Sequence, residues 1–321
     1  MLKRLWRNSL PSRLAACLSW ALAGAKVHPA ARLMASRSAL KLGRGAKVSA
    51  GVVLDCVADG RIELEEATWL AHHVELQTDG RIHVGRGTTV QRYSSINGNV
   101  RIGCFCIIAP SVFISSGTHP FRRTPYLPIR VQEQDATTGA LDRPVNIHDD
   151  CWLGVHVVIA PGVTLGKGVV VGANAVVTQD CPPYSVVAGA PARTLTPRLA
   201  WSPPDELDAT RRENVPYLYS GLALRYRHDE LVAEAIGGMR VEIAVPWRAT
   251  SADVHVEAAA PLILNLDGGE RFHASAGSNV VRITALHPAF ESDSQLRFRL
   301  AALTVAGSPE LCVRVLRTIS R

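Results

Sequence analysis

The chain has 321 residues, of which 47% are hydrophobic and 20% charged, so it can bury a substantial core and is not globally disordered. No apolar run approaches the roughly 20 residues that a membrane-spanning helix needs. The formal net charge of +7 is concentrated at one end, because residues 1–50 hold ten Lys and Arg and no acid, while the remainder carries 25 basic and 28 acidic residues.

Residues 1–40 are expected to form a basic helical segment. An apolar residue recurs every fourth position, which would place one apolar stripe on helices broken near Pro11; its members are Leu2, Trp6, Leu10, Leu14, Leu18 and Leu22. Such a segment either packs on the body of the protein or lies on the anionic surface of a membrane, and both remain open. It favours a membrane over nucleic acid, since Trp6 and Trp20 are its only aromatic residues. A secretory signal is disfavoured because Ser19 and Trp20 interrupt the apolar stretch.

An aliphatic residue returns every six positions through most of residues 42–177. The positions are Leu42, Val48, Leu54, Leu64, Leu70, Leu76, Val84, Val90, Ile96, Ile102, Ile108, Ile114, Ile147, Leu153, Ile159, Leu165, Val171 and Val177. A period of six fits neither a helix nor an ordinary strand, but it fits a triangular solenoid in which each hexapeptide is one short strand and a turn. Eighteen hexapeptides predict six coils of a parallel β-helix, which we assign to residues 41–195.

The largest break in this phase lies between Ile114 and Ile147. It begins with SSGTHPFRRTPYLP and replaces one six-residue step by 33 residues. Because a solenoid tolerates insertions only as loops at its corners, function is expected here.

Beyond the repeat, Ser202, the following prolines and Glu206 resemble a helix start, so residues 196–238 are predicted to be a helical linker. Residues 239–321 alternate apolar and polar positions and are predicted to form a small antiparallel β domain.

Residues 84–193 resemble the hexapeptide-repeat O-acetyltransferases, which include galactoside, maltose and polysaccharide O-acetyltransferases. The resemblance is carried by NVRIGCFCIIAPSVFISSGTHP (99–120) and by CWLGVHVVIAPGVTLGKGVVVGANAVVTQDCPPYSVVAGAPAR (151–193). It implies a mainly β fold with a left-handed β-helix, a homotrimer with active sites between neighbours, and acetyl-CoA as acyl donor without a metal.

His119 matches the catalytic histidine of this family. A sugar hydroxyl attacks a thioester poorly unless a base accepts its proton, and a neutral imidazole can do so near neutral pH. The competing interpretation is a surface histidine in a loop.

The resemblance also implies that Asn97 and Trp152 bind the acceptor. Asn97 precedes Ser115 by 18 residues, one full coil, so it should lie below the root of the His119 loop; the alternatives are a turn residue for Asn97 and core burial for Trp152.

The acetyl-CoA site is assigned by the same resemblance to positions where small side chains leave backbone amides accessible, one of which could hold the oxyanion, and to residues near the adenine and phosphate end. These positions are Gly154, Val155, Ala160, Ala173, Thr178, Gln179 and Arg193. Gln179 replaces a common lysine, which would weaken the phosphate contact. Two other departures put the acceptor in doubt. Asn97 stands where such enzymes carry an acceptor-binding acid, and no acid precedes Asp55, whereas they often supply another from an N-terminal segment.

We therefore expect an O-acetyltransferase acting on a sugar hydroxyl of a surface polysaccharide or its precursor. An N-acetyltransferase for an amino sugar or an antibiotic is the alternative within acyl transfer. A γ-type carbonic anhydrase is disfavoured because no suitably spaced histidines supply a zinc site. A purely structural scaffold leaves His119 and Trp152 unexplained. The seven cysteines form no C-x-x-C motif, so a cytoplasmic location is expected, with a peripheral position at the membrane left open.

Overall fold

The computed structural model describes the chain outside residues 1–17, 19, 123, 135–141, 228–229, 237–239, 268, 290–297, 306–310 and 321. The described residues are mainly β and divide into two compact units, residues 1–199 and 200–321. The predicted end of the β-helix at residue 195 therefore lies four residues before this division.

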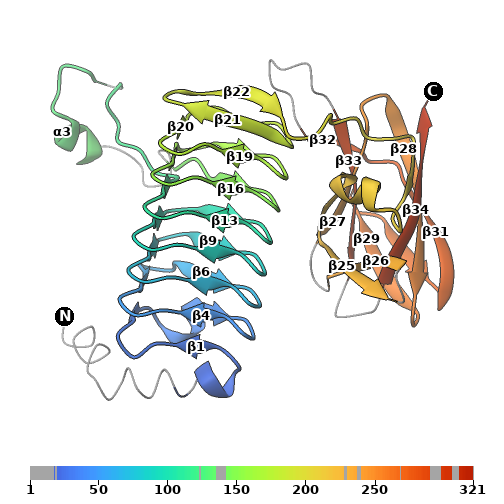
Figure 1. Cartoon of the computed structure of the whole chain (residues 1–321), viewed down its shortest axis with the longest axis horizontal. Coiled ribbons are helices and arrows are strands. Elements are labelled where there is room, and N and C mark those ends of the chain that lie inside the picture. Colours follow the sequence, from blue (N-terminus) through green and yellow to red (C-terminus); the bar gives the residue numbers. More distant parts are fainter. Residues whose placement is uncertain are drawn as a thin grey trace. The chain divides into compact units, whose positions relative to one another are not determined.

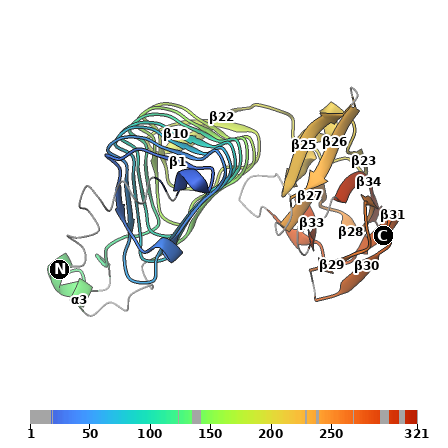
Figure 2. The same cartoon turned by 90° about the horizontal axis from the view of Figure 1, so that it is seen from below.

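The first unit is a parallel β-helix in which three sheets form the faces of a triangular prism (Figures 1 and 2). The first face contains β1 (Lys26–Val27), β4 (Lys47–Val48), β7 (Trp69–Leu70), β10 (Thr89–Val90), β13 (Ile107–Ile108), β16 (Trp152–Leu153), β19 (Val170–Val171), β21 (Ser185–Gly189) and β22 (Ala192–Pro197). The second face contains β2 (Arg32–Met34), β5 (Val53–Cys56), β8 (Glu75–Thr78), β11 (Ser95–Asn97), β14 (Phe113–Ser115), β17 (Val158–Ile159) and β20 (Val176–Val177). The third face contains β3 (Leu40–Leu42), β6 (Arg61–Leu64), β9 (Arg81–Val84), β12 (Val100–Ile102), β15 (Val145–Ile147) and β18 (Thr164–Leu165).

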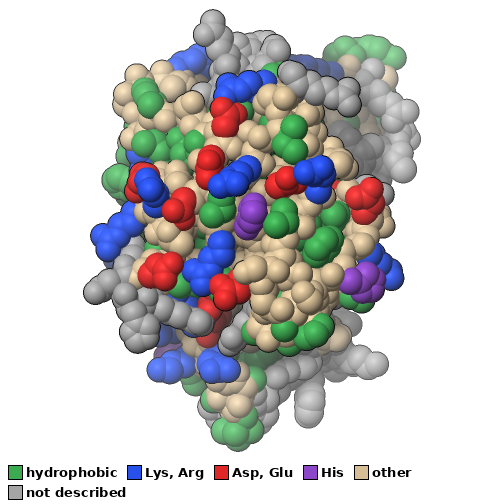
Figure 3. Space-filling model, turned by 90° about the vertical axis from the view of Figure 1, so that its right-hand side faces the viewer, with side chains coloured by type: hydrophobic (Ala, Val, Ile, Leu, Met, Phe, Trp, Pro, Cys, Tyr) green, Lys and Arg blue, Asp and Glu red, His purple; other side chains and the backbone are tan. Residues whose placement is uncertain are grey.

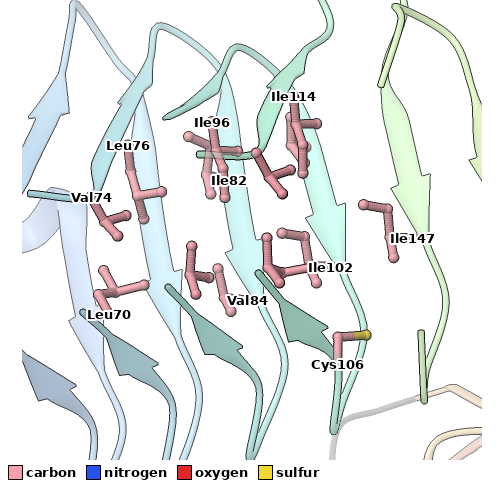
Figure 4. Packing of buried hydrophobic residues seen from close by; sticks show 14 of the residues in the cluster. Leu70, Val74, Leu76, Ile82, Val84, Ile96, Ile102, Cys106, Ile114 and Ile147 are labelled. Carbon is pink, nitrogen blue, oxygen red and sulfur yellow. The ribbon is translucent and has the colours of Figure 1, made fainter. Parts of the chain in front are cut away.

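The core of the prism consists of the side chains at the six-residue positions. Figure 4 shows several of them stacked along the interior, and Leu76, Ile96 and Ile114 are fully buried. These three are paired in register on β8, β11 and β14 of the second face. Each coil therefore places an aliphatic side chain on the equivalent one of the coil below, which buries apolar surface continuously. The β-helix predicted from the repeat is confirmed.

The prism begins earlier than residue 41. β1 and β2 pair in parallel with β4 and β5, so residues from Lys26 onward already belong to it, followed by a 3₁₀ helix at Arg37–Ala39. The interior of this first coil contains the small residues Ala25 and Ala31, which a search for large aliphatic residues misses. Of the predicted N-terminal helix, residues 18 and 20–22 are helical, and residues 1–17 and 19 lie outside the described residues.

A charged cluster covers part of the third face. Glu63 of β6 accepts a hydrogen bond from Lys41 and one of 2.7 Å from Arg81, both on neighbouring strands. His83 lies between Glu63 and Glu65, with its Nε2 3.3 Å from Glu65 Oε1. Burial alone would raise the pKa of Glu63, but the hydrogen bonds from Lys41 and Arg81 outweigh it and lower the pKa to about 2.

Stability should depend on pH through Glu63. Its pKa is lower in the folded chain than in the unfolded one, so its contribution is complete above about pH 4.5 and is lost as the pH falls toward 2. We expect Glu63→Gln to reduce the free energy of unfolding by about 1–2 kcal/mol at pH 7, with a smaller difference at pH 3. Urea unfolding at both pH values measures this, with Asp59→Asn at an exposed turn as control. A pH-independent difference would contradict it.

The second unit is an antiparallel β-sandwich with one core between its two sheets. One sheet contains β23 (Glu206–Asp208), β25 (Leu222–Arg227), β26 (Glu230–Ala235), β28 (Ala249–Ala258), β31 (Gly277–Ile283) and β34 (Leu311–Ser320). The other contains β24 (Leu218–Ser220), β27 (Arg240–Pro246), β29 (Leu262–Leu266), β30 (Arg271–Ala274), β32 (His287–Pro288) and β33 (Phe298–Val305). The predicted antiparallel domain is thus present, but it begins well before residue 239.

The helical linker predicted over residues 196–238 is wrong. Its described residues form β23, a 3₁₀ helix at Arg212–Tyr217, and strands β24 to β26. β25 and β26 pair as a hairpin, and β26 also pairs with β34, so distant strand pairing overrides the local helix preference of their Leu, Ala and Glu residues.

The sandwich carries many cross-strand ion pairs. Figure 3 shows basic and acidic side chains intermixed on the face that it displays. On the sheet that contains β34, Arg282 donates two hydrogen bonds of 2.8 Å to Asp253, and Arg314 lies 2.8 Å from Glu257. Opposite charges on adjacent strands thus neutralise one another, which stabilises the pairing of the strands modestly.

Candidate active site

The longest insertion leaves the prism at one corner. It starts after β14 of the second face, ends at β15 of the third face, and carries helix α3 (Ile129–Gln134). In Figures 1 and 2 this insertion, with α3, projects away from the stacked coils. The prediction of a long loop at the phase break is confirmed, and the loop brings His119 outside the prism with an exposed imidazole.

A partly buried polar cluster closes the root of the insertion. Asp142 accepts hydrogen bonds from the hydroxyl of Ser116 and from the side-chain amide of Asn99. The Ser116 hydroxyl oxygen in turn accepts the backbone N–H of Asn99 at 2.7 Å, and Ser116 is completely buried. The first and last residues of the insertion are therefore tied to the coil below, which fixes the point from which His119 leaves.

His119 contacts one acidic residue of the insertion. Its Nδ1 lies within hydrogen-bond distance of Glu133 Oε1 on α3. The side chain of His119 is 74% exposed and that of Glu133 is 29% exposed, so the carboxylate is the less accessible partner. The other oxygen of Glu133 lies 3.6 Å from Arg130 Nη1. The imidazole thus has one engaged nitrogen and one free of described contacts.

Asn97 lies where its spacing predicts. It is in register with Ser115 of the next coil and with Gln77 of the previous one, and Gln77 is in register with Asp55. Asp55, Gln77, Asn97 and Ser115 form a polar column on the second face, below the root of the His119 loop. Within it, Gln77 Nε2 donates a 3.5 Å hydrogen bond to Asp55, and Asn97 Nδ2 donates one of 3.2 Å to Ser95.

Trp152 lies on a different face from Asn97. It is on β16 of the first face, in register with Ile107 and Val170, and is 52% exposed. Core burial, the alternative interpretation of Trp152, is therefore excluded.

The predicted acetyl-CoA residues fall into two groups at different corners. Gly154, Val155 and Ala173 lie at the corner between the first and second faces, where a Cβ on Gly154 would come within 2.6 Å of the Ala173 nitrogen. Only glycine fits such a close approach of two coils. Val155 and Ala173 are exposed, whereas the Gly154 N–H donates to Val171 at 2.8 Å and is already used.

The second group lies at the corner between the second and third faces, where the His119 loop also emerges. Ala160 is half-buried, and its N–H donates to Val177 at 2.9 Å, while Thr178 and Gln179 are exposed. Arg193 is exposed on β22, a strand that pairs antiparallel with β21 at the end of the first face. His119 and Asn97 therefore lie at the second corner, together with Ala160, Thr178 and Gln179. The remaining residues lie on the first face or at the corner between the first and second faces; they are Trp152, Gly154, Val155 and Ala173.

Sequence reasoning missed the residues that hold His119 and its loop. Between Phe121 and Pro144 the only acids are Glu133, Asp135 and Asp142, and two of these make the contacts described above. The scarcity of acids in an arginine-rich insertion could have indicated that Glu133 and Asp142 make specific contacts. Nothing in the repeat indicated which acid would reach the imidazole.

Comparison with known proteins agrees with the repeat. Residues 144–179 match the family described as "Bacterial transferase hexapeptide (six repeats)". The chain is 35% identical over 138 residues to the galactoside O-acetyltransferase of Escherichia coli K12, a match that covers 40% of this chain and 61% of that enzyme. It is 37% identical over 110 residues to a chloramphenicol acetyltransferase of Agrobacterium fabrum, covering 30% of this chain and 51% of the relative.

Among solved structures, a hexapeptide-repeat acetyltransferase of Vibrio cholerae complexed with acetyl coenzyme A is 27% identical, with a TM-score of 0.32 over 47% of this chain and 72% of that chain. The chain matches less than two thirds of the length of either curated relative.

Proposed function

We propose that this hexapeptide-repeat chain, a relative of bacterial acetyltransferases, transfers an acetyl group from acetyl-CoA to a sugar hydroxyl, with His119 as the general base. The observation that carries the proposal is the position of His119, an exposed imidazole at the only long insertion among the described coils, with one nitrogen held by Glu133. The names of the relatives support acetyl transfer as the reaction.

The reaction follows from the chemistry of the imidazole. The free nitrogen of His119 accepts the proton of the acceptor hydroxyl while its oxygen attacks the thioester carbonyl. The carbon–sulfur bond then breaks, and the imidazolium returns the proton to the CoA thiolate. Since the N–H groups of Gly154 and Ala160 are engaged with neighbouring coils, the developing oxyanion requires another donor.

The complete site is proposed to form between copies of the chain. The second face separates the corner of Gly154, Val155 and Ala173 from the corner of His119, Ala160 and Thr178. One acetyl-CoA would touch both groups if the first corner of one copy faced the second corner of its neighbour, as in a cyclic trimer. Light scattering tests this, and a monomeric mass in a fully active preparation would disprove it.

The acceptor is proposed to be a surface polysaccharide or its precursor. The polar column supports an extended acceptor, because Gln77, Asn97 and Ser115 offer accessible hydrogen-bonding side chains over three successive coils, whereas Asp55 is buried. Exposed Trp152 could stack on a sugar ring contributed across the subunit boundary.

An N-acetyltransferase acting on an amino sugar or an antibiotic is the second candidate. The similarity to a chloramphenicol acetyltransferase keeps an antibiotic acceptor in view, but as an O-acceptor, because chloramphenicol carries hydroxyl groups and no amine. The decisive experiment is acetyl-CoA turnover against a panel of oligosaccharides, amino sugars and chloramphenicol. A sugar product that mild hydroxylamine cleaves is an ester and supports the proposal, whereas an ester formed only with chloramphenicol contradicts a sugar acceptor. A product that resists it is an amide and supports the alternative, and no turnover with any acceptor would count against both.

A cytoplasmic enzyme at the membrane surface is also proposed. Leu18 and Leu22 of the apolar stripe are 65% and 84% exposed, and the first fifty residues contain no acid. In the part of the chain that the structure describes, no helix has the length and apolarity needed to cross a bilayer. Co-sedimentation with anionic vesicles tests the proposal, and equal recovery of a variant lacking residues 1–22 would disprove it.

A further inference from the structure

Hydrogen bonds of the Gln132 side chain within the insertion determine the orientation of the neighbouring Glu133. Gln132, which is only 3% exposed, donates from Nε2 to the Leu127 carbonyl at 2.8 Å and accepts the Thr124 N–H at 3.2 Å. α3 starts directly after Pro128, whose carbonyl accepts the N–H of Val131 at 2.9 Å. A six-residue helix is unstable by itself, so these contacts fix its orientation and that of the next side chain, Glu133.

The carboxylate of Glu133 has a defined relation to the imidazole. One oxygen contacts His119 Nδ1 and the other lies 3.6 Å from Arg130. An ionised carboxylate can only accept hydrogen bonds, so the proton of a neutral imidazole must lie on Nδ1. The lone pair is then on Nε2, the nitrogen without a described contact.

We propose that Glu133 is a positioning residue for acetyl transfer, which holds His119 in the Nδ1–H tautomer so that Nε2 can accept the acceptor's proton. The proposal rests on the function proposed for His119. Glu133 also stabilises the imidazolium formed when Nε2 accepts the proton, because its negative charge lies at the opposite nitrogen. The insertion thereby supplies both the base and the group that orients it.

The test compares Glu133→Ala, Glu133→Gln and the control Val131→Ala, an exposed residue on the same helix. We expect Glu133→Ala to lower kcat by about 10- to 100-fold, with KM for acetyl-CoA changed less than about twofold. Glu133→Gln, whose amide oxygen can still accept from Nδ1, should keep the tautomer and lose less activity. Val131→Ala should match the wild type.

The tautomer itself is the second readout. ¹⁵N NMR of labelled His119 should show a protonated Nδ1 in the wild type and in Glu133→Gln, and a shift toward protonated Nε2 in Glu133→Ala. An unchanged tautomer with unchanged kcat in Glu133→Ala would overturn the inference. If His119→Ala is inactive while Glu133→Ala is fully active, only the role of Glu133 fails; if His119→Ala is fully active, the proposed function fails as well.

Discussion

His119→Ala should lower kcat for acetyl transfer by about 10²- to 10⁴-fold, the usual contribution of a general base. The loss should appear in kcat because the proton moves to the imidazole only as the new bond forms, whereas acetyl-CoA binds to other residues. KM for acetyl-CoA should therefore change less than about threefold. Steady-state kinetics with the best acceptor of the panel measures both constants.

The matched control is His72→Ala. His72 is also an exposed histidine at a turn of the prism, but its coil lies two below the root of the insertion. It should retain the activity of the wild type. Full activity of His119→Ala would exclude general-base catalysis by this residue, whatever the acceptor, and equal losses in both variants would indicate a general effect of removing a surface imidazole.

The repeat made the coil register predictable. A residue such as Asn97 is placed by counting, because parallel coils with inward aliphatic residues every six positions leave one register that buries them all. The same reasoning failed at the first coil, where Ala25 and Ala31 occupy the interior. Small residues carry too weak a hydrophobic signal to mark a repeat.

The insertion and the β-sandwich were less predictable because their contacts are not periodic. The Glu133 contact with His119 depends on the path of a loop that Gln132 braces, which no spacing rule encodes. In the sandwich, β25 and β26 contain good helix formers. Their strand conformation follows from pairing with each other and from the pairing of β26 with β34, some eighty residues later. Position within a repeat was therefore predictable, and contacts between non-repeating segments were not.

Ile114→Ala should produce the largest loss of stability among the changes considered. Ile114 is completely buried on β14, immediately before the insertion, and is in register with Ile96 below and Ile159 above. Removing its branched side chain leaves a cavity that stacked coils cannot collapse to fill, so the free energy of unfolding should fall by about 2–5 kcal/mol. Denaturant unfolding measures this loss.

Phe113→Ala is the control on the same strand. Phe113 is larger than Ile114 but 43% exposed on the outer surface, so its removal opens no cavity in the prism. In the isolated chain, we expect Phe113→Ala to lower the free energy of unfolding by less than about 1 kcal/mol. If copies associate through the second face, Phe113→Ala should instead weaken the oligomer, which makes unfolding depend more strongly on protein concentration. If both variants lose the same free energy of unfolding in a monomeric preparation, Ile114 cannot point into the prism while Phe113 points outward. That result would contradict the β-helix predicted from the repeat.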